Sequence, residues 1–259
     1  MAAPAHIPDL RGRRCLVTGG GTGIGAAVAL GLGAQGAHVA VHCHTSTAAA
    51  AAVAEAIVRA GGTAFVLSAD LAQLKAAATL VEAAAAGLGG LDVLVNNAGD
   101  LVARHPVAEM EDDFFDAILA LNLKSVFAAS RAAIPHLRRA GGGAIINTSS
   151  ISARNGGGGG VGAYAAAKAG VSSLTRTLAR ELAADRIRVN AVSPGIVLTR
   201  IHARNTTPEM MRTQVAGVPM GRAGTVDECV GLYLFLASAA MSGYITGQVI
   251  EINGGQLTP

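Results

Sequence analysis

RCLVTGGGTGIGAAVALGLGAQG, residues 14–36, joins a short apolar run to a glycine cluster and then to an alanine-rich segment. The run 14–17 predicts a β-strand, and the cluster TGGGTGIG at 18–25 predicts a turn that opens a helix. Gly19, Gly23 and Gly25 can adopt backbone angles that other residues avoid, and they let a diphosphate approach the main chain at a helix N-terminus. The stretch therefore predicts a strand–turn–helix unit that binds a dinucleotide.

The alternation of strand and helix continues along the chain. Further strands are expected at 37–43, 62–70, 91–99, 142–150, 187–195 and 247–252, and further helices at about 47–60, 71–86, 111–139, 161–184 and 225–238. Asn122 and Pro135 should bend or break the long helix. Strands separated by helices predict an α/β fold, a single Rossmann-type domain over 1–259 with a doubly wound parallel sheet of about seven strands and helices on both faces. The polar, methionine-bearing stretch 199–222 has weak periodicity and is expected to be a mobile lid over the substrate.

The composition excludes several classes of protein. Of 259 residues, 51% are hydrophobic and 14% are charged, so the chain buries a substantial core. The net charge of +3 comes from scattered arginines, which argues against a nucleic-acid partner. No run is long enough to span a membrane, and the N-terminus, with arginines after its apolar part, does not resemble a secretion signal. Cys15, Cys43 and Cys229 fit neither a disulfide framework nor metal-ligand spacing, so we expect a cytoplasmic protein without a metal.

A second stretch carries the chemistry: SSISARNGGGGGVGAYAAAK, residues 149–168. Tyr164 and Lys168 open a helical run and, four residues apart, share one face. A free phenol titrates near ~10, and a fixed ammonium nearby favours the phenolate and lowers that pKa toward neutrality. A hydroxyl from Ser149 or Ser150 could hold a substrate oxygen beside the phenol. On its own, such a tyrosine–lysine pair is common on helices.

The end of the second strand bears on the choice of nicotinamide cofactor. An acid there would bind the ribose 2′-hydroxyl and repel a 2′-phosphate, but this chain has Cys43, His44, Thr45 and Ser46. NADP(H) is therefore favoured, and NAD(H) remains possible because no arginine or lysine is present to bind the phosphate. His42 and His44 could help if protonated, but we interpret them as solvated histidines at a strand end.

Taken together, five motifs in this order and spacing resemble the short-chain dehydrogenase/reductase family in its single-domain form, over about 12–255. They are TGxxxGxG as Thr18–Gly25, NNAG as Asn96–Gly99, YxxxK as Tyr164–Lys168, a PGxVxT-like Pro194–Thr199, and the tail ITGQVIEINGG.

The resemblance implies a set of catalytic residues. Tyr164 would be the general acid/base, Lys168 would lower its pKa and bind the nicotinamide ribose, and Ser150 would orient the substrate carbonyl. Asn122 matches the family asparagine that bends its helix to hold a proton-relay water. Ser150 precedes Tyr164 by fourteen residues, one more than is common in the family, so Ser149 is kept as the alternative.

The resemblance also implies the cofactor contacts. The residues expected at the dinucleotide are Gly19, Thr22, Gly23, Ile24, Gly25, His44, Thr45, Asp70, Leu71, Asn97, Ala98, Gly99, Tyr164, Lys168, Pro194, Gly195, Val197 and Thr199. Asp70 could accept a hydrogen bond from the adenine amino group or, alternatively, cap the helix that follows it. Asn96 is expected to connect neighbouring strands.

The implied activity is reversible hydride transfer between a nicotinamide and a small-molecule ketone or secondary alcohol. The chain resembles 3-oxoacyl-acyl-carrier-protein reductases and sugar or polyol dehydrogenases about equally. A carrier protein is acidic, so its reductase needs a basic patch near the cleft, for which Arg138 and Arg139 are the possibilities, although arginines at a helix end are often simply solvated. A hydrophobic substrate surface is suggested by the apolar residues of the lid, Ile201, Met210, Met211, Val215, Val218 and Met220.

Two further expectations concern alternatives and assembly. A dinucleotide-binding sensor without catalysis is the remote alternative, and the presence of Asn122, Ser150, Tyr164 and Lys168 together argues for an enzyme. The resemblance implies a homodimer or homotetramer that packs through the two long helices after the fourth and fifth strands and through the last strand with its flanking helix.

Overall fold

Seven parallel strands form one sheet in the order β3-β2-β1-β4-β5-β6-β7. The structure is a computed structural model that describes residues 6–258. The prediction that the N-terminus is not a secretion signal falls partly on residues 1–5, which lie outside this range. The strands are β1 (Arg14–Val17), β2 (His38–Cys43), β3 (Thr63–Ser68), β4 (Val93–Asn96), β5 (Gly143–Thr148), β6 (Ile187–Pro194) and β7 (Val249–Ile252). The predicted doubly wound sheet of about seven strands is confirmed.

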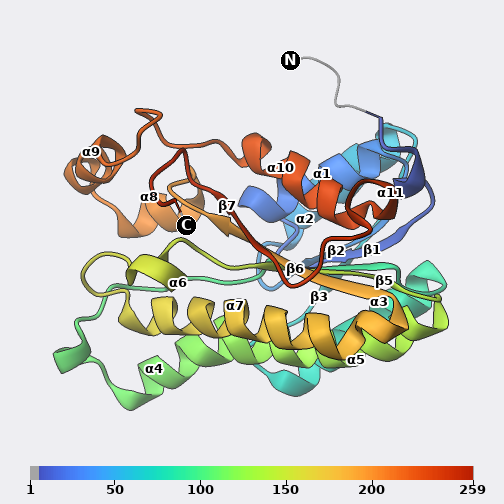
Figure 1. The fold of residues 1–259 in the computed structure, drawn as a ribbon, viewed down its shortest axis with the longest axis horizontal. Helices are drawn as coiled ribbons and strands as arrows, with labels where there is room; N and C mark the ends of the chain where they lie inside the picture. Colours follow the sequence, from blue (N-terminus) through green and yellow to red (C-terminus); the bar gives the residue numbers. More distant parts are fainter. Residues whose placement is uncertain (1–5, 259) are drawn as a thin grey trace.

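Helices cover both faces of this sheet (Figure 1). One layer contains α1 (Gly23–Ala34), α2 (Thr47–Arg59) and α10 (Val226–Ala237), and the other contains α3 (Leu74–Leu88), α5 (Ser125–Arg139) and α7 (Gly162–Leu182). The shorter helices are α4 (Asp112–Leu119), α6 (Ser152–Asn155), α8 (Arg200–Asn205), α9 (Pro208–Ala216) and α11 (Ala239–Ser242), with 3₁₀ turns at Pro8–Leu10, Val107–Glu109 and Ala183–Asp185.

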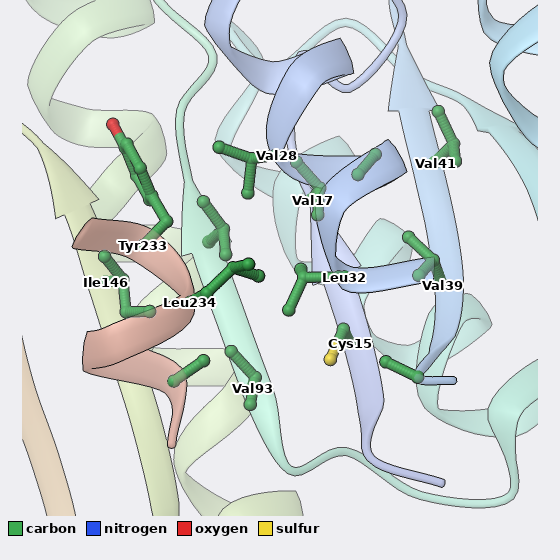
Figure 2. Close-up of a cluster of buried hydrophobic side chains, with 14 of the residues drawn as sticks. Cys15, Val17, Val28, Leu32, Val39, Val41, Val93, Ile146, Tyr233 and Leu234 are labelled. Carbon is green, nitrogen blue, oxygen red and sulfur yellow. The ribbon is translucent and has the colours of Figure 1, made fainter. Parts of the chain in front are cut away.

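The core between β1 and its covering helices is built from small and branched aliphatic side chains. In Figure 2, Val17 of β1 lies among Val28 and Leu32 of α1 and Val41 of β2, and Leu234 of α10 closes the same cluster. The central strands β1 and β4 carry short apolar runs, CLV and VLV, as expected for a parallel sheet covered on both faces, and β6 is buried along its whole length although it includes Arg188, Asn190 and Ser193. This packing fixes the carboxyl ends of the strands, from which the loops of the site begin.

The strand order places a cleft at the carboxyl edge of the sheet. From β1 the chain winds outward to β2 and β3, then returns to β4 on the other side of β1. The loops after β1 and β4 therefore leave in opposite directions, which opens a crevice at this switch point, where open α/β sheets bind ligands. The glycine cluster follows β1, the NNAG motif follows β4, and the serine pair follows β5.

The long helix predicted over 111–139 consists of two helices joined by a π-turn. Residues Ala120–Lys124 form this turn, so the bend expected at Asn122 is confirmed. The break considered at Pro135 does not occur, because α5 runs through it with Ala133 and Leu137 buried on either side. The run Asp112–Arg139 is long and apolar enough to pass a compositional test for a membrane span. Because α5 packs on α3 and on the sheet, we assign the run to the fold of this domain.

No helix was expected in the lid stretch 199–222, whose periodicity is weak, but it forms α8 and α9. Thr207 caps α9 by accepting a hydrogen bond from the Met210 N–H, and Pro208 occupies the first turn. These capping residues define the helix although its apolar periodicity is weak. In Figure 1 both helices lie with α6 at one end of the sheet.

Candidate active site

A cavity of about 760 Å³ occupies the carboxyl edge of the sheet. Seventeen of the eighteen residues expected at the dinucleotide line it, and Gly25 lies buried directly beneath. Ser150, Tyr164 and Lys168 line the same cavity, whereas Asn122 is fully buried behind it. One cavity therefore combines the predicted nucleotide-binding residues with the predicted catalytic hydroxyls.

The glycine turn is closed by contacts that leave no room for side chains. A Cβ on Gly25 would stand 2.2 Å from the Gly19 carbonyl oxygen, and Gly19 has a left-handed φ of +63°. The Asn97 amide donates to the carbonyls of Thr18 and Gly19. Above Gly23, by contrast, an added Cβ would meet only the Thr199 side chain, at 3.7 Å.

The N-terminus of α1 behind this turn has no side-chain cap and no acid in its first turn. Its N–H groups and the positive end of the helix dipole therefore face the cavity without a competing anion. These features fit the diphosphate of a dinucleotide, which would lie over the turn at the start of α1.

Hydrogen bonds between strands hold the NNAG loop at the turn. The Thr18 hydroxyl oxygen accepts from the N–H groups of Asn97 and Ala98, at 2.9 and 3.0 Å. The Asn96 amide donates to Asn147 Oδ1 on β5 at 2.9 Å, which confirms that Asn96 connects neighbouring strands. The backbone at this end of the cleft is therefore fixed by residues that follow directly from the motifs.

His42 is not solvated, so its interpretation as an exposed strand-end histidine is wrong. Only 2% of the residue is exposed, because the glycine turn and the β3–α3 loop close over the end of β2. Its Nδ1 accepts from the Gly19 N–H at 3.0 Å, and its Nε2 lies 3.0 Å from the Ala69 carbonyl. This requires the neutral tautomer with the proton on Nε2. Burial lowers the pKa of His42, and the repulsion of His44 lowers it further, which favours that neutral form.

The predicted cofactor-selecting residues lie at the far end of the cavity. His44, Thr45 and Ser46 line it, and His44 and Thr45 are exposed. Helix α2 starts immediately afterwards with no side-chain cap and no acid in its first turn. Asp70 lines the cavity and also accepts a hydrogen bond from the Ala72 N–H at 3.0 Å, so its side chain stabilises the turn before α3.

The two serines have different surroundings. Ser149 is bonded to Ser172 Oγ at 2.7 Å and donates to the Lys168 carbonyl, which ties β5 to α7. The Ser150 side chain is hydrogen-bonded to the Tyr164 hydroxyl and also accepts from the Ser152 N–H. Ser150 is thus the serine beside the phenol. The extra residue in its spacing from Tyr164 is taken up by the glycine tract, where Gly156, Gly157 and Gly160 have left-handed φ angles.

Lys168 is held under the phenol. Its Nζ donates to the Thr148 carbonyl at 2.8 Å and lies 5.6 Å from the centre of the Tyr164 ring. Burial lowers the pKa of Lys168 from 10.5 to about 8. The ammonium form still predominates at neutral pH, within reach of a developing phenolate.

The expected lowering of the Tyr164 pKa is not found in the free protein. Burial raises it from 10.0 to about 12; the hydrogen bond from Ser150 lowers it, and the negative charge of Asp100 raises it further. Lys168 alone would lower the pKa of the phenol, but the desolvation of the phenol and the nearby Asp100 carboxylate both raise it. Tyr164 is therefore protonated at neutral pH and ready to donate its proton.

Asn122 connects the π-turn to the loop after β4. Its amide donates to the carbonyls of Asp100 and Ile118, at 2.8 and 3.0 Å, and its Oδ1 accepts from the Asp100 N–H. A Cβ on Gly99 would stand 2.6 Å from this Oδ1 and 3.1 Å from Lys168 Nζ. Gly99 therefore leaves room for both the asparagine and the lysine to approach the loop after β4.

The substrate end of the cavity contains charged residues that the sequence did not single out. Asp100, Arg104 and Arg204 line it, and Arg204 forms an ion pair with Asp100. In the sequence, only the position of Asp100 directly after the NNAG motif could have indicated a charged residue at the site. Arg104 and Arg204 belong to no motif.

The apolar roof expected from the lid is not present. Of its six proposed residues only Ile201 lines the cavity. Met211 faces a separate groove beside α1, Val218 is buried in the fold, and Met220 is 65% exposed. Met211 of α9 lines that groove, so the lid residues no longer support a hydrophobic substrate surface, which stays a prediction.

The proposed carrier-protein patch also lies elsewhere. Arg138 and Arg139 end α5, next to the start of β5, whereas the cavity lies beyond the end of that strand. Arg138 is paired with Asp185 at 2.7 Å. These arginines are therefore at the opposite edge of the sheet from the cleft.

Comparison with known proteins agrees with this geometry. A family model described as enoyl-(acyl carrier protein) reductase matches residues 19–256. The 2-dehydro-3-deoxy-D-gluconate 5-dehydrogenase of Escherichia coli is 35% identical over 204 residues, covering 78% of this chain and 80% of the relative. The chain belongs to the short-chain dehydrogenase/reductase family.

Solved structures share the whole architecture. The NADH-dependent reductase A1-R′, described as responsible for alginate metabolism, superposes with a TM-score of 0.89 at 40% identity, covering 97% of this chain and all of the other. A short-chain dehydrogenase from Burkholderia cenocepacia in complex with NADP gives 0.89 at 36% identity, covering 96% and 99%. Similar proteins thus use either nicotinamide cofactor. The chain is an oxidoreductase of this family that binds a nicotinamide dinucleotide.

Proposed function

We propose that the protein interconverts a ketone and a secondary alcohol with NADP(H) as its redox partner. The observation that carries the proposal is the meeting of the Ser150 and Tyr164 hydroxyls in the cavity that also contains the glycine turn. A carbonyl oxygen bound between these hydroxyls would place its carbon toward the nucleotide-binding side of the cleft.

When bound, the cofactor supplies or accepts the hydride at C4 of its nicotinamide. In the reducing direction the carbonyl carbon gains that hydride, and its π electrons move to the oxygen. Ser150 and Tyr164 stabilise the growing negative charge by donating hydrogen bonds, and Tyr164 transfers its proton to give the alcohol. The Lys168 ammonium stabilises the phenolate left behind, which regains a proton from water. Asn122 positions the loop that carries Asp100 and Gly99.

The preference for NADP(H) rests on the end of the cavity near α2. No acid stands at His44, Thr45 or Ser46 to repel a 2′-phosphate, and the free N-terminus of α2 would favour an anion. We expect kcat/KM to be higher with NADPH than with NADH, and a clear preference for NADH would contradict this part of the proposal.

Consumption of NADPH in the presence of a panel of activated ketones tests the activity. The proposal predicts ketone-dependent loss of absorbance at the reduced nicotinamide band, with the secondary alcohol as product. Tight NADPH binding without turnover of any ketone would instead support the non-catalytic sensor.

An NAD-dependent sugar or polyol dehydrogenase is the second candidate. It is favoured by the polar lining near Ser150, where Ser152, Asn155 and Gln214 could bind hydroxyl groups, and by the named activity of the E. coli relative. Oxidation of polyols with NAD⁺, faster than any ketone reduction with NADPH, would favour this candidate. Arg138 and Arg139 lie away from the cleft, so the hypothesis of a 3-oxoacyl-acyl-carrier-protein reductase has lost the basic patch that was proposed to bind the carrier protein.

We further propose a cytoplasmic homotetramer or homodimer. Phe115 of α4 and Phe127 of α5 are 40% and 45% exposed, and Tyr244 before the edge strand β7 is fully exposed. Exposed aromatics at these two places suit the expected contact faces. The three buried cysteines are free thiols, as in a reducing compartment. Gel filtration with light scattering tests the assembly, and a monomer would contradict it.

A further inference from the structure

Arg104 is a part-buried cation at the substrate end of the cavity, and no carboxylate in the described part of the chain pairs with it. Its Nε donates to the Asn205 carbonyl and its Nη1 to the Gly159 carbonyl, both at 2.8 Å. The guanidinium is thus fixed between the lid helix α8 and the glycine tract. These two bonds use two of its five N–H donors.

The charge of Arg104 is not compensated by its surroundings. Backbone carbonyls bring only partial negative charge, and a part-buried guanidinium without a counter-ion is costly. A carboxylate matches its planar donor fork and would complete its hydrogen bonding. Because the guanidinium is already oriented by two loops, little rotational freedom would be lost on binding.

The neighbouring charges leave this end of the cavity positive. Arg204 and Asp100 neutralise each other as an ion pair. Arg200 also lines the cavity, but it lines the groove beside Gly23 and Thr199 as well, so it belongs to the nucleotide end. Lys168 is engaged beneath Tyr164. Among the described residues, Arg104 therefore brings a positive charge without a carboxylate partner to the space beyond the catalytic hydroxyls.

We propose that the substrate is an oxo acid, whose carboxylate binds Arg104 while its ketone lies between Ser150 and Tyr164. The polar side chains of Ser152 and Gln214 on the same cavity wall suit a hydroxylated carbon chain between the two groups. This inference rests on the proposed carbonyl reduction and names its substrate class.

The test compares oxo acids with their methyl esters, which keep the ketone and remove the charge. The wild-type protein is assayed with NADPH and 3-oxobutanoate, 4-oxopentanoate and 5-oxohexanoate, each beside its ester. For at least one chain length, kcat/KM for the acid should exceed that for the ester by about tenfold or more, the size expected of a bidentate charged pair. The ratio should fall as salt is added. A preference for every ester would overturn the inference.

Variants separate the anion-binding role of Arg104 from its contacts with the two loops. Arg104→Met should remove the acid preference and leave the ester less affected, whereas Arg104→Lys, which keeps the charge, should retain part of the preference even if all rates fall. Arg212→Met, a matched charge removal on the exposed part of α9 outside the cavity, should leave the ratio unchanged.

The acid-to-ester ratio is taken within each variant, so a general disturbance of the loops cancels. Equal losses for acid and ester in Arg104→Met would show that Arg104 only holds the loops, and would overturn the inference while leaving carbonyl reduction intact. If the wild-type protein reduces no acid, ester or neutral ketone, the proposed function itself fails and the inference fails with it.

Discussion

The two ends of the cleft are held together by different kinds of contact. At the nucleotide end, main chain packs on main chain: a Cβ on Gly25 would collide with the Gly19 carbonyl, and His42 and Thr18 bond directly to backbone N–H groups. At the substrate end, Arg104 from the loop after β4 and Arg204 from helix α8 contact other segments through their side chains. At the first end the backbone approach of Gly19 and Gly25 leaves no room for a Cβ on Gly25, so this position tolerates little change. The second end is built from side chains on a loop and on the short helix α8, so substitutions there can alter specificity without altering the fold.

Tyr164 lies where the two ends meet, and its loss should have the largest effect. Tyr164→Phe removes the proton donor but keeps the ring, so kcat for ketone reduction should fall ~10³-fold. The affinity for NADPH, measured by fluorescence titration, should stay within a few-fold of the wild-type value. Retained turnover would remove the phenol from the mechanism.

The serines provide a matched pair on the substrate side. Ser150→Ala should lower kcat ~10²-fold, because it removes one donor to the developing oxyanion. Ser149→Ala breaks bonds to Ser172 and Lys168, so it should mainly lower the free energy of unfolding, by about 1 kcal/mol. Steady-state kinetics and denaturant unfolding of both variants check this assignment. The opposite pattern would transfer the catalytic role to Ser149.

Gly25→Ala addresses the nucleotide end. The new methyl group would force the Gly19 carbonyl aside at a cost of about 1–3 kcal/mol, so the Kd for NADPH should rise about 5- to 150-fold. Gly231→Ala is the control, because Gly231 lies exposed in α10 with nothing within 4 Å of an added Cβ, and alanine there should leave binding unchanged. Equal affinities for Gly25→Ala and the wild type would contradict the close packing of the turn.

The pH dependence of cofactor binding should show the smallest effect. Burial holds the folded pKa of His42 below its ordinary value of 6.5, so its contribution to stability is present above that value and is lost as the pH falls through the folded pKa. Protonated His42 can no longer accept from Gly19. As the pH falls through this lowered pKa, we expect the Kd for NADP⁺, measured by calorimetry, to rise.

His42→Asn is the matched variant for this measurement. Asparagine offers an acceptor oxygen near the position of Nδ1 and does not titrate, so its pH dependence should be flatter. All groups other than residue 42, including the 2′-phosphate of the cofactor, are common to both proteins, so their contributions cancel in the comparison. Identical pH profiles for the variant and the wild type would show that His42 is not the titrating group.

The difference between the two ends also explains what the sequence could predict. Some features have signals within a few adjacent residues: the glycine turn, the seven strands, Asn96 and the Tyr164–Lys168 pair. The structure places these features as the sequence predicts. Helix α9 was missed because its cap at Thr207 is a weaker signal than periodicity. Arg104 gave no signal, since its partners Gly159 and Asn205 are far away in the chain.

Two interpretations failed because burial cannot be read from a linear pattern. His42 ends a strand and looked exposed, but loops from β1 and β3 cover it. The Tyr164 pKa was expected to fall because of Lys168, yet desolvation and Asp100 outweigh that effect. In both cases the missing quantity is the burial of the ionisable side chain, and burial is defined only by the folded chain.

Transfer of label from the cofactor to the product tests the central claim most directly. NADPH carrying deuterium at the transferable C4 position is incubated with the protein and the most active ketone of the panel, and the product is analysed by mass spectrometry. The account predicts a secondary alcohol one mass unit heavier than the unlabelled product, with the deuterium on the carbinol carbon. An alcohol formed without the label, or label appearing elsewhere in the product, would contradict hydride transfer to a carbonyl in this cleft.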